Sequence, residues 1–107
     1  MTLHELCDAC GVSRRAVQGY EKAGLVQPSG RNERGWLLYD PAAQELIRTI
    51  HTYQRFGFPV KEIRLLLSLP PEGVKERLTA QRGLLEAERA ELESILSLLD
   101  EWIDRLN

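Results

Sequence analysis

The chain has 107 residues, which is the size of one ordinary folded domain. Its residues are 43% hydrophobic and 28% charged, enough for a modest core, and no apolar run reaches the ~20 residues that a membrane helix needs. A net charge of −2 argues at first against a nucleic-acid partner, and two cysteines are too few for a disulfide framework.

The net charge divides unevenly along the chain. Residues 1–64 hold nine Lys and Arg against seven Asp and Glu, whereas residues 65–107 hold five against nine. The stretch 13–39 has five basic side chains, opposed only by Glu21 and Glu33. This sign suits a nucleic-acid contact in the first half, although an ordinary solvated surface would carry the same charges.

Two short helices joined by a tight turn are predicted at the N-terminus. Thr2 and Glu5 form a capping-box pattern, apolar residues follow at helical spacing, and Gly11 ends the first helix. Ser13 is a good N-cap for the second helix, which ends at Gly24. Two helices with a turn of about three residues form a helix-turn-helix unit.

The next segment, residues 26–40, predicts a small hairpin, or wing. Pro28, Gly30 and Gly35 interrupt a polar loop, and a short β-prone run over residues 36–39 follows. We expect Tyr39 to pack under this wing.

Two further helices complete the predicted head. Asp40 is an N-cap and Pro41 takes the first position of the third helix, which ends near residues 56–58. A fourth, shorter helix follows Pro59. The side chains expected to face the core from these helices are Leu46, Ile47, Ile50, Tyr53, Val60, Ile63, Leu66 and Leu67.

Pro70 and Pro71 precede a final helix over roughly residues 72–106, in which apolar residues recur in steps of four and three. A helix of ~35 residues is ~50 Å long, more than so small a domain can cover. We therefore expect it to pair with the same helix of a second copy. Packing along its own head is the alternative. The chain is accordingly divided into domains 1–69 and 70–107. Two polar residues, Gln81 and Glu88, interrupt the seam. The expected dimerisation residues are Leu78, Leu85, Leu92, Ile95, Leu99, Trp102 and Leu106.

Four motifs occur in a recognisable order along these elements. They are GVS at 11–13 leading to Arg15, YEKAGL at 20–25, GWLLYD at 35–40, and FGF at 56–58 leading to Glu62 and Ile63. In this order, before a terminal coiled-coil helix, they resemble the DNA-binding half of MerR-type transcription regulators. The resemblance implies a mainly α, winged helix-turn-helix fold that dimerises through the last helix as an antiparallel coiled coil. It further implies a bacterial, cytoplasmic regulator whose two heads read a palindromic operator in double-stranded DNA.

Two departures from the family pattern favour a rival hypothesis. The family usually has Arg-Tyr-Tyr-Glu in the second helix and Gly-Tyr-Arg in the wing, where this chain has Gln18-Gly19-Tyr20-Glu21 and Gly35-Trp36-Leu37. Two expected phosphate-facing arginines are therefore missing, which should weaken DNA binding and flatten its salt dependence. The rival is a MerR-like protein-binding adaptor, of the co-chaperone modulator type, that has lost DNA binding.

The candidate DNA contacts lie on the second helix and the wing. Arg reads guanine and Gln reads adenine, so Arg14 and Gln18 are assigned to base edges by position, and Arg15 to phosphate by resemblance. Tyr20 is expected in the core with its hydroxyl directed to a phosphate. Solvated surface side chains are the alternative. The full set is Ser13, Arg14, Arg15, Gln18, Tyr20, Lys22, Arg31, Arg34 and Trp36.

Metal binding and catalysis have weak support. His4, Cys7 and Cys10 recur every three residues, but this spacing drifts around a helix and a metal site needs three or four converging ligands. We expect no metal or cofactor, and Cys7 to act as a small core residue. No nucleophile elbow, phosphate loop or Glu-x-x-His pair is present, so no enzyme is expected. RNA polymerase or another protein is a further candidate partner. Three alternatives for signal input stay open: the regulator acts without a ligand, it senses through a protein partner, or the chain is a truncation of a longer regulator.

Overall fold

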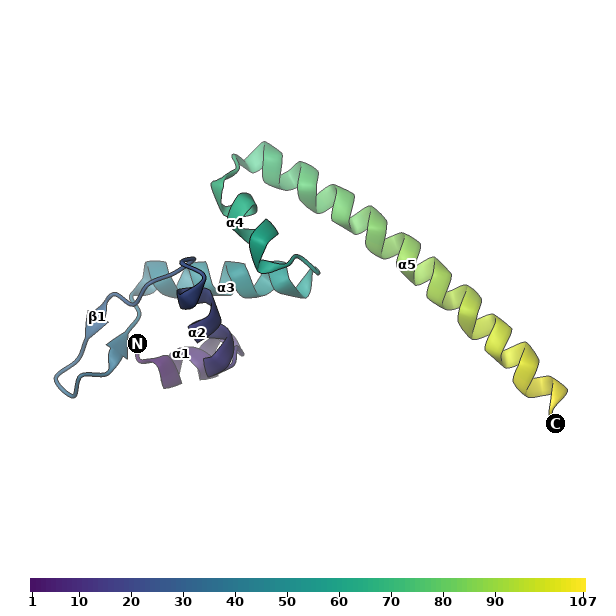
Figure 1. The fold of residues 1–107 in the computed structure, drawn as a ribbon, viewed down its shortest axis with the longest axis horizontal. Coiled ribbons are helices and arrows are strands. Elements are labelled where there is room, and N and C mark those ends of the chain that lie inside the picture. Colours follow the sequence, from purple (N-terminus) through teal and green to yellow (C-terminus); the bar gives the residue numbers. More distant parts are fainter. The chain divides into compact units, whose positions relative to one another are not determined.

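Figure 1 shows the computed structural model, which describes residues 1–107 and divides into two compact units, Met1–Ser68 and Leu69–Asn107. The second unit, here called the arm, is built on one helix, α5 (Pro71–Arg105). The first unit, here called the head, contains α1 (Leu3–Cys10), α2 (Arg14–Lys22), β1 (Gly30–Arg31), β2 (Leu37–Leu38), α3 (Pro41–Arg55) and α4 (Val60–Ser68). The predicted fold class, mainly α with a winged helix-turn-helix and a long last helix, is confirmed.

The head helices begin at the residues that the sequence predicts. The Thr2 hydroxyl accepts from the Glu5 N–H at 3.3 Å, and the Glu5 carboxylate accepts from the Thr2 N–H at 3.0 Å, which completes a capping box. Ser13 caps α2 and Asp40 caps α3 through their side-chain oxygens. Each such cap contributes about 1 kcal/mol.

Helices α2 and α3 end in the same motif. After α2, Gly24 adopts a left-handed φ of 76°, and the Leu25 N–H donates to the Tyr20 carbonyl at 2.9 Å. At the end of α3 the Phe58 N–H donates to the Tyr53 carbonyl, and the two rings pack edge to face with centroids 6.4 Å apart. This Schellman arrangement turns the chain back toward the core after each helix.

The head core receives side chains from all four helices and from the base of the wing. One expectation is wrong, because Leu67 is 36% exposed. Helix α4 buries a narrow stripe through Ile63 and Leu66, and Leu67 lies ~100° further round the helix from Leu66, outside this stripe. The fully buried side chains are Leu6, Val17, Tyr20, Tyr39, Ile47, Ile50 and Ile63.

The wing is a two-stranded antiparallel hairpin in which Arg31 pairs with Leu37. Its loop has a Gly35 N–H bond to the Asn32 carbonyl at 2.9 Å, followed by a left-handed φ of 79° at Gly35. This is the three-residue hairpin loop with a glycine bulge. The Asn32 side-chain oxygen also accepts from the Arg34 and Trp36 N–H groups, at 2.9 and 3.0 Å. Asn32 is not among the residues for which the sequence predicts a role.

The first residues of the chain join the wing to α1. The Tyr39 N–H donates to the Met1 carbonyl at 2.7 Å, and Thr2 forms a single antiparallel bridge with Leu38. Figure 1 accordingly shows the N-terminus beside the wing. Main-chain hydrogen bonds therefore hold the wing next to the start of α1.

The arm exposes its apolar side chains. Helix α5 has 35 residues and no buried residue, and of the predicted seam only the first part, near Leu78, is half-buried. Ion pairs along the helix, Arg82 with Glu86 and Arg89 with Glu93, lie at i, i+4 spacing. No helix combines the length and the apolar composition that crossing a membrane requires.

Candidate nucleic-acid interface

Helix α2 has one buried and one polar side. Val17 and Tyr20 are buried, whereas the remaining candidate contacts on this helix are exposed. The helix is open to a close approach at Gly19, because a Cβ atom there would meet nothing within 4 Å. The exposed candidates that the structure gathers on α2 and its N-cap are Ser13, Arg14, Arg15, Gln18 and Lys22.

Tyr20 differs from the other candidates on this helix. Its side chain is 2% exposed, and its hydroxyl donates to Gln54 Oε1 of α3 at 2.5 Å. Burial raises the pKa of the Tyr20 hydroxyl. The expected core position is present, but the hydroxyl bonds to α3 rather than extending to the surface.

Three candidate contacts stand on the exposed wing. Arg31 Nη1 donates to the Gly35 carbonyl at 2.6 Å, so this side chain braces the hairpin loop. The Arg34 guanidinium lies over the Trp36 ring, 5.4 Å from its centroid, and the Trp36 side chain is 54% exposed. At an exposed site a cation–π contact contributes about 0.5–1 kcal/mol.

Contacts between distant residues support this surface. The Tyr39 hydroxyl, under the wing as predicted, donates to the Glu21 carboxylate on α2. Burial and this bond to Glu21 raise the pKa of Tyr39. Arg64 of α4 donates to the Ala23 carbonyl at the end of α2. No local sequence signal identifies these pairs, since their members are 18 and 41 residues apart.

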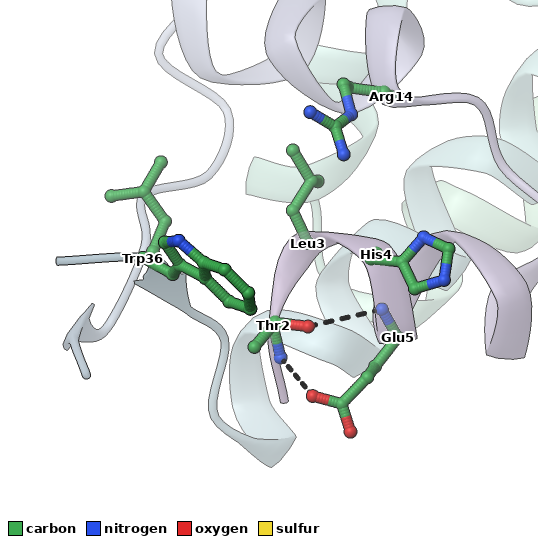
Figure 2. Close-up of a pocket in the computed structure, with 7 residues that line it drawn as sticks. Thr2, Leu3, His4, Glu5, Arg14 and Trp36 are labelled. Carbon is green, nitrogen blue, oxygen red and sulfur yellow. Dashed lines mark hydrogen bonds between the residues drawn. The ribbon is translucent and has the colours of Figure 1, made fainter. Parts of the chain in front are cut away.

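A groove of about 670 Å³ separates the wing from the starts of α1 and α2. Figure 2 shows its lining residues. The Glu5 carboxylate turns back to Thr2, and the hydrogen bonds from Thr2 lower the pKa of Glu5. His4 lies 3.4 Å from the Asp8 carboxylate on the exposed side of α1. The lining residues are Thr2, Leu3, His4, Glu5, Arg14, Trp36 and Leu37.

The cysteines and histidines do not converge. The structure contains no group of three or more His, Cys, Asp or Glu side chains able to hold a metal ion. Cys7 and Cys10 are free and half-buried. Burial raises the pKa of the Cys7 thiol, so it stays protonated at neutral pH.

Comparison with known families decides what this arrangement is. The sequence model of the MerR HTH family regulatory proteins matches residues 1–69, and the MerR DNA-binding model matches residues 44–107. The chain belongs to the MerR family. The resemblance carried by its short motifs is thereby confirmed.

Two relatives of this MerR-family chain are named as regulators. The mercuric resistance operon regulatory protein of Bacillus cereus is 34% identical over 65 residues, which cover 61% of this chain and 49% of the relative. The transcriptional activator TipA of Streptomyces coelicolor is 30% identical over 94 residues, covering 88% of this chain and 37% of TipA. The chain therefore spans half or less of the length of these curated relatives.

Solved MerR-family structures share the fold. A transcriptional regulator from Bacillus cereus superimposes with a TM-score of 0.80 and 27% identity, covering 94% of this chain and 78% of that one. HiNmlR, a regulator lacking the sensor domain and solved bound to promoter DNA, superimposes with a TM-score of 0.65 and 21% identity. That comparison covers 91% of this chain and 78% of HiNmlR.

Proposed function

We propose that this chain is a sequence-specific DNA-binding regulator of transcription that acts as a homodimer on a palindromic operator in the bacterial cytoplasm. In this proposal residues 1–69 are the DNA-binding domain and residues 70–107 are the dimerisation helix. The observation that carries it is the exposed polar side of α2, in a head of the MerR family, next to a basic wing.

Helix α2 and the wing have separate roles in this proposal. Helix α2 enters the major groove, where Gln18 reads a base edge and Arg15 contacts a phosphate. The wing side chains Arg31 and Arg34 contact the flanking backbone, since phosphate contacts position a protein on DNA. Gly19 supports a close approach because nothing stands within 4 Å of its missing Cβ.

The arm supports a dimer with antiparallel helices. In water, an apolar seam that is exposed along a helix is stabilised by pairing with another helix. Residues 71–82 hold three basic against two acidic side chains, whereas residues 83–107 hold two against seven. Antiparallel pairing brings the acidic end of one helix to the basic end of the other, and parallel pairing aligns the two acidic ends. The exposed apolar side chains that carry this contact include Leu85, Leu92, Ile95, Leu99, Trp102 and Leu106.

The rival hypothesis of a protein-binding adaptor is less well supported. Its motivation was the two missing arginines and the net charge of −2. The acidic excess belongs to the arm, and the relatives that match this chain are transcription regulators. RNA polymerase or another protein is the further candidate partner of such a regulator.

The test is selection of bound duplexes from fragmented bacterial DNA and from a random-sequence pool. We expect selected duplexes with two-fold symmetry and half-sites about one helical turn, ~34 Å, apart. Sedimentation should give two chains per duplex. Equal affinity for selected and random duplexes at physiological salt contradicts the proposal, and capture of a protein with no DNA shift at low salt supports the adaptor instead.

A further inference from the structure

The groove between the wing and the starts of α1 and α2 has walls of two chemical kinds. Trp36 and Leu37 from the wing and Leu3 from α1 supply apolar surface. Arg14, in the first turn of α2, supplies a guanidinium. In Figure 2 this guanidinium lies above Leu3, with the Trp36 indole across the groove.

Arg14 lies close to α1. It lines the groove together with Leu3 and His4 from the first turn of α1. Its position on the groove wall directs it toward the gap beside the wing. This placement differs from that of a side chain extended from the outer side of α2 to a base edge.

A unit of the DNA backbone has the complementary chemistry. Its phosphate is an anion, for which the planar guanidinium is a preferred partner, and its deoxyribose has an apolar face that packs on aromatic and aliphatic side chains. The second guanidinium, of Arg34, lies over Trp36 and adds positive charge at the rim. The one carboxylate of the lining, Glu5, bonds to the Thr2 N–H instead of facing Arg14.

We propose that this groove binds one deoxyribose-phosphate unit of the duplex backbone, with Arg14 on the phosphate and Trp36 on the sugar. The inference rests on the proposed function and changes the role of Arg14 from base reading to phosphate contact. It also gives a role to Trp36 and Leu37, which occupy the place where the family usually has a charged wing. Their apolar contacts contribute to the DNA-binding affinity, and this contribution does not depend on salt.

The walls of the groove are held together before DNA binds. The bridge between Thr2 and Leu38 and the 2.7 Å hydrogen bond from the Tyr39 N–H to the Met1 carbonyl join the wing to the start of α1. Because main-chain bonds set this spacing, little ordering is needed on binding, which favours affinity.

The experiment uses a duplex selected by the full chain and the variants Arg14→Ala and Trp36→Ala, with Lys61→Ala as the control for loss of an exposed positive charge. We expect Arg14→Ala to weaken binding roughly tenfold, as for one charge-assisted hydrogen bond, and to reduce the slope of log K against log salt by about 1. Its preference among duplexes with single base changes should stay that of the unaltered chain. Trp36→Ala should weaken binding with the slope unchanged, and Lys61→Ala should change neither quantity.

A second measurement locates the phosphate. In a series of duplexes, one charged phosphate at a time is replaced by an uncharged methylphosphonate. At one position this replacement should weaken DNA binding by the unaltered chain but cause no further loss of binding in Arg14→Ala. Circular dichroism checks that each variant is folded. The groove proposal is overturned if Arg14→Ala has a relaxed base preference and is as sensitive to the methylphosphonate as the unaltered chain. That result would leave the proposed DNA-binding function in place. Failure of the unaltered chain to prefer any duplex refutes the proposed function and the groove together.

Discussion

The Tyr39 hydroxyl, at the base of the wing, donates a hydrogen bond to the carboxylate of Glu21 on the helix proposed to read DNA. The two residues are 18 positions apart, and the Tyr39 ring is buried in the head core. This bond connects the base of the wing directly to α2 and contributes to the relative orientation of the two elements.

Replacing Tyr39 by Phe should therefore destabilise the head. The change removes a hydrogen bond to a charged group and leaves the half-buried Glu21 carboxylate without this donor, a cost of about 1–2 kcal/mol. Urea unfolding measures this loss. Tyr53→Phe is the matched control, since it removes a hydroxyl at a half-buried position on α3. Equal losses in the two variants would show that the bond to Glu21 has no special weight.

Alkaline pH should destabilise the head through two buried tyrosines, Tyr20 and Tyr39. Tyr20 and Tyr39 have pKa values raised by burial, and the unfolded chain releases tyrosine protons near pH ~10. Their contribution is complete below that value and is lost as pH rises toward the folded pKa values, because the unfolded state then holds fewer protons. The free energy of unfolding, followed by urea titration from pH ~8 to ~11, should fall less steeply in Tyr39→Phe. An identical pH dependence in that variant would contradict the assignment.

Two glycines of the helix-turn-helix should respond oppositely to alanine. Gly24 has a φ of 76°, which an L side chain adopts at a cost of about 1–2 kcal/mol, so Gly24→Ala should lower stability. Gly19 lies within α2 with open space around it, so Gly19→Ala should raise stability by about 1 kcal/mol. Thermal unfolding checks both signs. If Gly19→Ala also weakens DNA binding in the folded protein, the open space there serves the close approach of DNA.

The seam on α5 should control assembly. Leu92→Glu places a charge on the proposed dimer contact, beside the polar seam residue Glu88, and should shift the protein to single chains in sedimentation velocity runs. Ala90→Glu adds the same charge on the opposite side of the helix and should leave the dimer intact. Dissociation by both substitutions would mean that net charge, rather than the seam, governs assembly. A dimer that survives Leu92→Glu would place the interface elsewhere.

Local sequence signals account for the elements of this chain. Ser13 and Asp40 cap helices where they are predicted, because their side chains bond to main-chain groups three residues away. Residues of the seam follow a heptad over α5, and this period is itself a property of the sequence. The family motifs belong to the same class of signal, and the fold that they predict is the fold of the structure.

Contacts between side chains of different elements were determined only by the tertiary structure. Glu21 with Tyr39, Tyr20 with Gln54 and Arg64 with Ala23 are pairs formed between elements that the fold brings together. Leu67 is predicted in the core but is exposed, because α4 is buried only along one narrow stripe. The sequence places Arg14 on α2, but it does not show what its side chain faces. Arg14 lines the groove because the fold brings the wing and α1 next to the start of α2. Local hydrogen bonds and periodicity are encoded within a few residues, whereas these contacts depend on which surfaces the packed core brings into reach.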